Sequence, residues 1–486
     1  MPNRRNWAVV ASVALHHAVL VWLWARDFPR YGTDGANFKQ IAIELAERGR
    51  FLAPTFFEAI PRSNEFLAVY PPFYPYLNAA VFAVFGRSFG VGLAFDLTLH
   101  AALVTVLVVV VHRCGAPHWA TALLPLGLFH LLDPFGRLET LATLLTVVAL
   151  ILLLGGPRAR WAAFGVLGLA AATNPFVAFA GAVIGAGFLF ARNERFTALL
   201  AAQGLTAPTV MVALWWPLLP GSLPPLLDQL KAHRALTGDA SVAAIFRQAP
   251  MLFVSLALLT VAVAALRPAN PRDGKLAPET SKLVRSLVVT VPLSIVVFQL
   301  GYRFSYHYRA LVFVVAAAAV IHVAGVQPRW KQAVLLGALG VGALGNGAIA
   351  FRNVLAAAAR EPALPRYGEI LRRVDAAVPT TASVASLGDL WGINLTHPHF
   401  VDVHHSSTFP DYVVSSTWSD PVGVLQSPSY AREISAHYEE LHGVAEAYEP
   451  GCKLHLGPLK VPVARGTCGW NVRIWRRRPG TSTLPP

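Results

Sequence analysis

Long apolar runs, separated by short polar loops, make up most of residues 1–351. A helix needs about 20 mostly apolar residues to cross the roughly 30 Å hydrocarbon core of a bilayer. One apolar stretch, 161–191, is longer than a single span needs and is interrupted by Thr173, Asn174 and Pro175. A residue before proline avoids helical geometry. We therefore predict two short helices there that form a hairpin, and about eleven spans in all. The other spans are predicted at about 7–26, 90–112, 119–132, 138–154, 197–219, 249–267, 284–301, 306–326 and 331–351.

The distribution of charge among the loops supports this division. With a cytoplasmic N-terminus, the loops on the cytoplasmic side hold fourteen Lys/Arg and three Asp/Glu, which is the bias of the positive-inside rule. A single span at 161–191 would reverse every later loop and remove the bias. We therefore expect a protein of the plasma (inner) membrane. Its extracytoplasmic side would carry the loop 27–89, the turns near 133–137 and 173–175, the loop 220–248, the turn 302–309 and everything after 351.

The long loop 27–89 concentrates polar residues in a chain that is otherwise sparsely charged. After Asp34, apolar residues recur at helical spacing at Phe38, Ile41 and Leu45, which predicts an amphipathic helix lying on the bilayer surface. Asp34 would lie at its N-terminus, where the helix dipole favours a carboxylate. The alternative is that Asp34 or Thr33 only caps the helix.

Residues 352–486 change in composition, because they are polar and contain no apolar run long enough to cross a bilayer. Helices are predicted at 365–379 and 429–448, and strands at 381–388, 399–405 and 470–477, which indicates a small soluble α/β domain. The fold class is thus mainly α, with a polytopic helical domain (1–351) followed by this extracytoplasmic domain (352–486). Cys452 and Cys468 fall on the oxidising side, so we expect them to form a disulfide.

Composition narrows the class of protein. The chain has 486 residues, of which 55% are hydrophobic, a formal charge of +14 and a pI near 10.0. Such a basic chain raises the possibility of nucleic-acid binding, but most Lys and Arg lie in short loops between apolar runs and not on one clustered face. The charge is explained by membrane topology, and no nucleic-acid partner is expected.

Charged side chains beside membrane spans are costly and mark candidate sites. Carboxylates and cations gathered at one membrane face would suit a lipid-linked phosphate, since Arg and Lys pair with phosphate and a carboxylate takes a proton from an attacking hydroxyl or amine. Taken singly, Glu139 could cap its helix, and Arg303 and Arg309 could be interfacial anchors. The residues expected at this face are Asp34, Asp133, Arg137, Glu139, Arg303, His307 and Arg309, with Asp96 slightly inside the second span.

Five segments occur in an order that resembles the GT-C superfamily of integral-membrane glycosyltransferases, nearest to its protein O-mannosyltransferase and aminoarabinose-transferase branch. They are TDGANFKQIAIELAERGRF, YPPFYPYLNAAVFAVFG, GRLETLATLLTVVALILLL, GLAAATNPFVAF and YHYRALVFVVAAAA. The resemblance covers residues 1 to about 350. It implies a sugar donor linked to polyprenyl phosphate, with Asp34 as catalytic base or acceptor-orienting group and Glu139 as the second acidic residue.

The sequence departs from that family at two positions. The Lys often found before Pro-Pro is Tyr70, so the donor phosphate must be bound by other cations, and the second acidic residue is Glu139 with Asp133 as a nearby competitor. A divalent cation (Mg²⁺ or Mn²⁺) held by Asp34, Glu139 or Asp133 is the one cofactor that these acidic residues suggest. The phosphate-binding candidates are Lys39, Arg62, Arg137, Arg303, His307 and Arg309, and Tyr70, Pro71, Pro72 and Tyr74 would line the donor lipid and sugar pocket.

The predicted reaction moves a sugar, with inversion, from the lipid donor to a lipid, glycan or protein acceptor. A phosphate leaving group stays anionic, so cations stabilise it and one carboxylate activates the nucleophile. The alternatives are a transporter or flippase of a lipid-linked or anionic substrate, although no internal duplication is evident, and a receptor or scaffold. A metal site is a further alternative for the cluster His397, His399, Asp402, His404 and His405, against a solvated strand face.

Overall fold

The fold is described from a computed structural model of the full chain. Its bundle of helices carries a smaller sheet-containing unit at one end, and several segments that bear on the predictions lie outside the part described here. The described residues are 4–28, 33–53, 60–113, 116–127, 136–192, 195, 197–220, 223–236, 329–334, 336–337, 358, 365–387, 391–397, 399–401, 410–417, 436–445, 452–456, 459–464 and 471–480.

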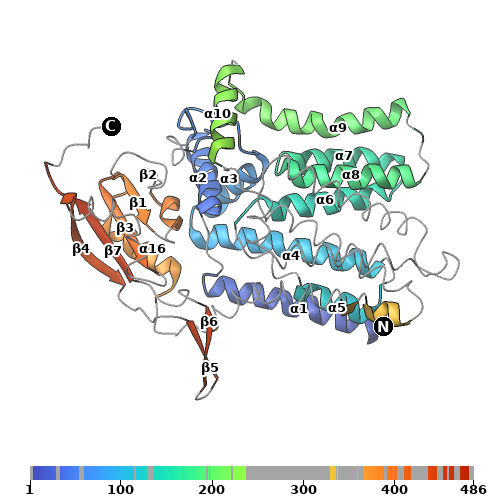
Figure 1. The fold of residues 1–486 in the computed structure, drawn as a ribbon, viewed down its shortest axis with the longest axis horizontal. Coiled ribbons are helices and arrows are strands. Elements are labelled where there is room, and N and C mark those ends of the chain that lie inside the picture. The colour runs from blue at the N-terminus through green and yellow to red at the C-terminus, as the bar shows by residue number, and fades with distance from the viewer. Residues whose placement is uncertain are drawn as a thin grey trace.

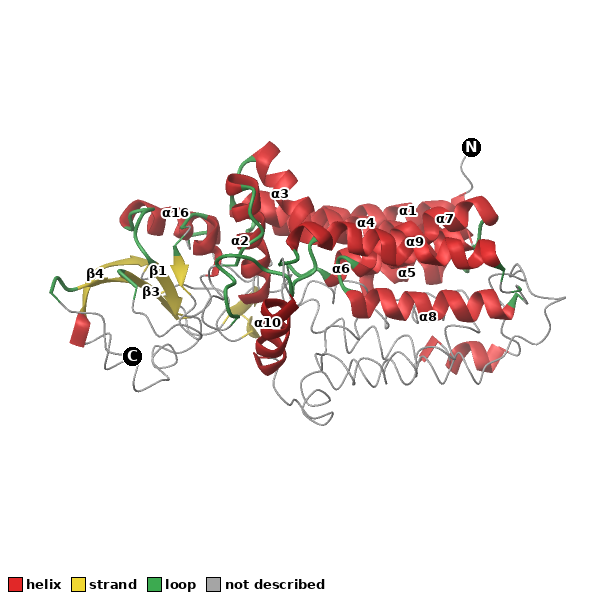
Figure 2. Ribbon diagram, turned by 90° about the horizontal axis from the view of Figure 1, so that it is seen from above, coloured by secondary structure: helices red, strands yellow, loops and turns green. Residues whose placement is uncertain are grey.

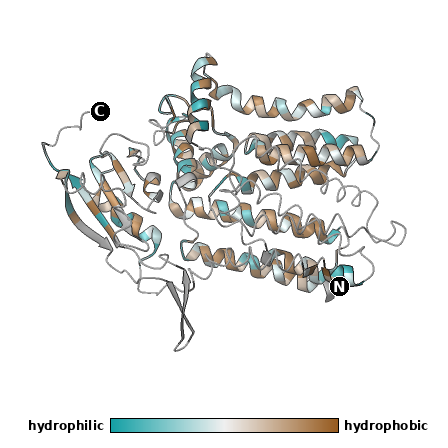
Figure 3. Cartoon of the chain, in the orientation of Figure 1, coloured by the Kyte–Doolittle hydropathy of each residue, from teal (hydrophilic) through white to brown (hydrophobic). Residues whose placement is uncertain are grey.

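The helical body consists of elongated helices that run side by side (Figures 1 and 2). Within the described residues, three stretches are long and apolar enough to cross a membrane: Trp7–Ala25, Phe89–Arg113 and Ala198–Leu218. Brown, apolar residues recur along the length of the bundle in Figure 3. The predicted spans 249–267, 284–301 and 306–326 lie outside the described residues. The helices are α1 (Arg4–Ala25), α4 (Phe89–Arg113), α5 (His118–Gly127), α6 (Glu139–Leu153), α7 (Pro157–Ala171), α8 (Pro175–Ala191) and α9 (Ala198–Trp215).

The stretch 161–191 is indeed divided into two helices. α7 ends at Ala171, and α8 begins at Pro175 after Asn174, whose side chain caps it by accepting the backbone N–H groups of Phe176 and Val177. The two helices pack against each other and against α6. A glycine permits the close packing of α8 on α6, because a Cβ at Gly181 would lie 2.4 Å from Thr146. Gly168 likewise lets α7 approach α9, because a Cβ there would lie 2.5 Å from the Ala207 carbonyl oxygen. The hairpin predicted from the proline is confirmed.

One end of the bundle carries the elements that do not run along it. α2 (Thr33–Arg48), α3 (Phe73–Phe85), the 3₁₀ helix η3 (Trp216–Leu218), α10 (Leu223–Leu236) and the sheet lie at that end, and the chain's N-terminus lies at the other (Figure 1). The turns before α6 and between α7 and α8 open toward the same end as α2, as the predicted alternation of loops requires. α3 was not predicted, because its segment was interpreted as the end of a loop.

The C-terminal segment forms a five-stranded sheet of order β2-β1-β3-β7-β4 with helix α16 (Tyr367–Ala377) and 3₁₀ helix η4 (Trp391–Leu395). β1 pairs in parallel with β2 and β3, whereas β7 is antiparallel to β3 and β4. A separate hairpin pairs β5 with β6. The strands are β1 (Val384–Leu387), β2 (Phe400–Val401), β3 (Tyr412–Thr417), β4 (Tyr438–Ala445), β5 (Cys452–Leu456), β6 (Leu459–Ala464) and β7 (Asn471–Arg477).

The helix predicted at 429–448 is wrong over Tyr438–Ala445, where the chain forms β4. Glu and Ala favour helices, but tertiary pairing prevails here. β4 lies along β7 with two register shifts, Tyr438 is buried, and Glu439 pairs with Arg476 across the strands at 2.5 Å. Cross-strand contacts of this kind stabilise an edge strand whose sequence lacks a clean alternation.

The sheet unit packs directly on the end of the helical body. Tyr367 of α16 is fully buried, and its ring lies 4.6 Å from that of Phe89 at the start of α4. The Asp27 carboxylate, just beyond α1, accepts the Gly368 backbone N–H at 3.0 Å, and Asp27 itself has a positive φ of 57°. η4 packs against α2, and Ile393 belongs to the same buried cluster as residues of α1, α2 and α4. α2 is therefore covered by the sheet unit.

Gly168→Ala tests the close packing of α7 on α9. The added methyl group would meet the Ala207 carbonyl and Val210 at 2.5 and 2.8 Å, so we expect a loss of about 1–3 kcal/mol in stability from overpacking. Gly204→Ala on the facing helix is the control, because a Cβ there meets nothing within 4 Å, and it should be neutral or slightly stabilising. Thermal unfolding of the purified protein in detergent measures both, and equal midpoints for the two variants would contradict this packing.

Candidate active site

Asp34, the predicted base, lies in the first turn of α2, and its side chain is outside the described part of the structure. The rest of α2 is more enclosed than predicted. The polar side chains of Asn37, Lys39, Gln40 and Glu44 are all buried, and so are its apolar residues Phe38 and Ile41. Exposed polar side chains occur in its last turn, at Glu47 and Arg48. The expectation of a helix lying on the bilayer surface is therefore corrected: one side of α2 packs on α3 and another is covered by η4. This enclosure fixes the backbone that carries Asp34.

Lys39 is the centre of a buried polar network beneath α2. Its ammonium forms an ion pair with Asp96 of α4 at 2.9 Å and donates to the Tyr74 hydroxyl at 3.1 Å. It also donates to the amide oxygen of Asn78. The Tyr74 hydroxyl in turn donates to the other Asp96 oxygen at 2.6 Å. The side chain of Lys39 is 0% exposed and that of Asp96 is 6% exposed, so this network joins α2, α3 and α4 out of contact with water.

The electrostatics of Lys39 follow from this burial. Removal from water lowers the pKa of its ammonium, and the adjacent Asp96 carboxylate opposes that shift. A buried charge with its partner removed costs about 3–5 kcal/mol. The pair therefore has to be kept or replaced as a unit.

A second polar group lies at the start of α6. Arg137 Nε donates to Glu139 Oε2 at 3.1 Å, and both side chains are about 10% exposed. Asn174, from the turn between α7 and α8, donates from Nδ2 to Glu139 Oε1 at 3.3 Å. Glu139 is thus held by donors from two separate turns.

The two polar groups are connected through the backbone. The Tyr74 hydroxyl also lies 3.1 Å from the Gly136 carbonyl oxygen, next to Arg137. The backbone N–H of Phe73 donates to the Ala172 carbonyl at 3.0 Å, next to the capping turn of α8. Four of the five motif segments in the sequence therefore meet at one end of the bundle: α2, the YPPFYPY segment, the turn before α6 and the turn before α8.

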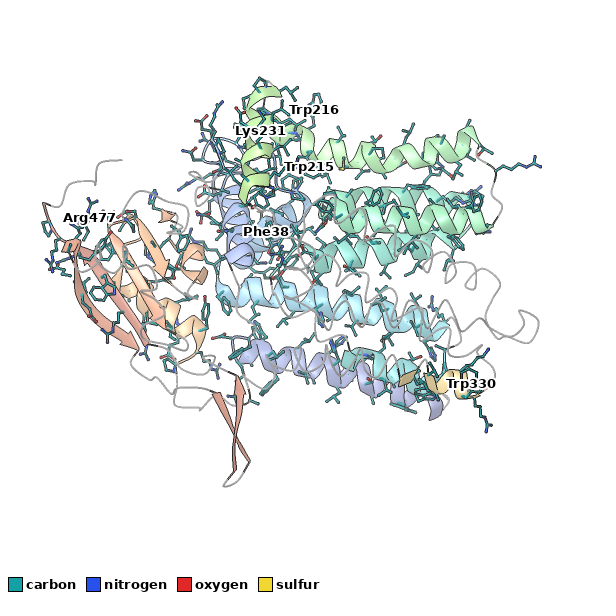
Figure 4. All side chains as sticks on the ribbon, in the orientation of Figure 1. Phe38, Trp215, Trp216, Lys231, Trp330 and Arg477 are labelled. Carbon is teal, nitrogen blue, oxygen red and sulfur yellow. The ribbon has the colours of Figure 1, made fainter. Side chains whose placement is uncertain are left out.

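The predicted pocket segment Tyr70, Pro71, Pro72 and Tyr74 lies between α2 and α10. The Tyr70 ring lies 5.5 Å from that of Phe38 and 5.0 Å from that of His233, while Tyr74 is fully buried in the network. Figure 4 shows Phe38 on α2, with Trp215 and Trp216 where α9 gives way to α10.

Gln229 and Trp215 hold the loop that precedes this segment in the chain. The buried Gln229 of α10 accepts the Ala68 N–H at 3.0 Å and donates to the Pro61 and Phe66 carbonyls, each at 2.9 Å. Trp215 Nε1 donates to the Ala68 carbonyl at 3.0 Å. The loop that leads to Tyr70 is therefore held by α9 and α10.

The remaining predicted residues are dispersed or not described. Arg62 is exposed and pairs with Glu65 at 2.6 Å, so it is not brought to Glu139 by any described contact. Of the proposed histidine cluster, His397 is buried 3.4 Å from Asp375, whereas His399 is exposed. No group of three His, Cys, Asp or Glu side chains that could hold a metal occurs in the described ranges. The side chains of Asp133, Arg303, His307, Arg309, Asp402, His404, His405, Cys452 and Cys468 lie outside them, so the disulfide stays a prediction.

The sequence did not reveal which polar side chains interact at this site. It identified Asp96 as a charge inside a span and Lys39 as a cation, but not that they pair. It used Asn174 only as a helix break and did not single out Asn78. A charge inside an apolar run always needs a partner, and that rule could have pointed to Lys39.

The chain was compared with known proteins. Neither a protein-family model nor a curated protein sequence matches it. Among solved structures, ArnT from Cupriavidus metallidurans bound to undecaprenyl phosphate superposes over 100% of both chains with a TM-score of 0.56 at 14% identity. The chain has the ArnT fold. The fold expected from the motifs is thereby confirmed. The Archaeoglobus fulgidus oligosaccharyltransferase, tethered with an acceptor peptide, matches 98% of this chain and 89% of its own at 11% identity and a TM-score of 0.47.

Lys39→Met tests the buried network. The substitution leaves the Asp96 carboxylate buried without its ammonium partner, so we expect a loss of about 3–5 kcal/mol in stability. The double variant Lys39→Met with Asp96→Leu should recover most of that loss. Arg62→Met, which removes one side of the exposed pair with Glu65, is the control and should cost less than about 1 kcal/mol. Unfolding midpoints in detergent measure the stability of the single variant, the double variant and the control. A double variant no more stable than Lys39→Met would show that the pair does not act as a unit.

Proposed function

We propose that this chain is an integral-membrane glycosyltransferase that moves a sugar from a polyprenyl-phosphate donor to an acceptor, at the end of the bundle that carries α2. The observation that carries the proposal is the convergence of four motif segments, far apart in sequence, on one polar site at that end. The shared fold supports it, since the ArnT structure is bound to undecaprenyl phosphate. The site lies beside apolar helices, where a polyprenyl tail would remain in the membrane.

In the proposed reaction, an acceptor hydroxyl or amine attacks the anomeric carbon and the bond from that carbon to the phosphate oxygen breaks. The electron pair of the broken bond leaves with the phosphate, and the proton of the acceptor passes to a carboxylate, for which we propose Asp34. Attack from the face opposite the phosphate inverts the anomeric configuration. The leaving group is already anionic, so it needs positive charge and no proton.

The described contacts support a division of roles among the predicted residues. Lys39 is fully buried and engaged with Asp96, Tyr74 and Asn78, so we assign it to holding α2 in place and not to the phosphate. Arg137 lies beside Glu139 at the turn before α6, and we propose it for the phosphate. Glu139 would assist in orienting the reactants. Arg62, Arg303, His307 and Arg309 remain proposed donor contacts, and Tyr70, Pro71 and Pro72 remain the proposed lining of the donor pocket.

A bound Mg²⁺ or Mn²⁺ would supply further positive charge for the phosphate. Glu139 already accepts from Arg137 and Asn174, and the Asp34 and Asp133 side chains are outside the described residues. No step of the proposed reaction is routed through a metal.

Asp34→Asn tests the proposed base. The amide keeps the size and the capping capacity of the carboxylate but cannot take a proton, so turnover should fall by about 10²- to 10⁴-fold while the protein remains folded. A deletion strain should accumulate the polyprenyl-phosphate sugar, detected by lipid mass spectrometry. Wild-type protein should remove that lipid, and an Asp34→Asn protein present at equal abundance should not.

Three results would count against the proposal or a part of it. A deletion strain that accumulates no lipid-linked sugar would contradict the proposed polyprenyl-phosphate donor. A deletion strain in which the lipid-linked sugar is made normally but stays on the other membrane face would favour the transporter or flippase. Asp34→Asn protein that clears the lipid at the wild-type rate would reduce Asp34 to a helix cap.

A further inference from the structure

Asn174 makes two kinds of contact from one buried side chain. It is 2% exposed and lies in the turn between α7 and α8. Its Oδ1 accepts the backbone N–H groups of Phe176 and Val177 at 3.0 and 3.2 Å, which caps α8. Its Nδ2 donates to Glu139 Oε1 at 3.3 Å. The same amide therefore ends one helix and contacts the carboxylate at the start of another.

The cap determines which end of the amide faces Glu139. Oxygen and nitrogen of an asparagine amide are distinguished by their partners, and two backbone N–H groups can donate only to the oxygen. The nitrogen then has to point away from α8, toward the carboxylate. An acceptor facing Glu139 would require the cap to be broken.

We propose that Asn174 is a positioning residue for Glu139, which holds the carboxylate ionised and in one orientation by a hydrogen bond fixed through the α8 cap. This inference rests on the proposed function and adds to it a residue that neither the motifs nor the fold comparison assigns. From the turn before α6, Arg137 donates from Nε to Glu139 Oε2 at 3.1 Å and from Nη2 to Oε1 at 3.4 Å. From the α7–α8 turn, Asn174 adds a second donor to Oε1. The contact from Asn174 thus depends on the packing of the hairpin on α6.

The charged and titratable groups around this contact are known from the packing. Arg137 faces Glu139 on its own turn, and Tyr74 of α3 lies close enough for the Glu139 charge to act on its hydroxyl. Asp96 and Lys39 lie behind Tyr74. Among these described groups, Arg137 is the nearest cation, so a new negative charge at position 174 would compete with Glu139 for it.

Asn174→Asp separates the cap from the contact. Asp caps a helix as well as Asn does and suits the helix dipole, but its second oxygen would face Glu139 where an N–H donor stood. Two carboxylates at that distance repel each other or share a proton. Asn174→Ser is the second variant, because its hydroxyl can also cap α8 while no amide donor remains. Thr197→Asp is the matched control, since Thr197 caps α9 by accepting the Leu200 N–H at an exposed position outside the site.

Transfer is measured with full-length purified protein added to membranes of the deletion strain, which would contain both the accumulated donor and its unused acceptor; the released polyprenyl phosphate is quantified. Asn174→Asp should lower the rate near neutral pH by about tenfold or more and reach half its maximal rate about one pH unit or more above wild type. Asn174→Ser should lower the rate without that displacement of the profile. Thr197→Asp should match wild type in both.

A measurement without catalysis keeps the test independent of the proposed function. In detergent, the thermal stability of Asn174→Asp relative to wild type should fall as the pH rises, because the shared proton is lost, and this dependence should vanish in an Asn174→Asp, Glu139→Gln double variant. If wild type transfers no sugar but the stability pattern holds, the proposed function fails and the contact stands. Wild-type stability and pH profile in Asn174→Asp, or an undiminished rate in Asn174→Ser, would overturn the positioning role.

Discussion

The ion pair between Lys39 and Asp96 is the constraint on which the candidate site depends. It joins the first helix of the polar loop to an apolar helix, and Tyr74 and Asn78 supply the hydrogen bonds that make burial of both charges tolerable. Such a pair adds little net stability compared with apolar side chains of the same size, but it permits few alternative arrangements. Its effect is to fix α2, and with it the backbone of Asp34, against α3 and α4.

The rest of the site is assembled around that fixed point by short turns. Tyr74 reaches Gly136 before α6, and Phe73 reaches Ala172 before α8. Glycines at 168 and 181 allow α6, α7, α8 and α9 to approach closely, so the two turns that hold Glu139 are rigidly spaced. The sheet unit covers another side of α2 through η4, which contains Ile393. The backbone of α2 is therefore held by packing on more than one side.

Much of this fold could be predicted from sequence because its signals are local. The break at Asn174 and Pro175 and the helix after Asp34 depend on the spacing of neighbouring residues. The strand at β4 and the partner of Lys39 depend on residues far away in the chain. Glu and Ala in 429–448 favour a helix, but pairing with β7 makes part of this segment a strand. Lys39 alone is a reasonable phosphate ligand, but the structure pairs it with Asp96. Composition cannot reveal such long-range partners, although an isolated charge in an apolar run shows that one must exist.

The most direct test of the central claim is to locate the donor lipid on the protein. A photoactivatable polyprenyl phosphate, bound to the full-length protein in nanodiscs and cross-linked, can be mapped by peptide mass spectrometry. We predict labelling by the phosphate end of the probe at the YPPFYPY segment and the turns before α6 and α8, with competition by unlabelled polyprenyl phosphate. Competable labelling confined to the opposite end of the bundle, at the turns following α4 and α6, would contradict it.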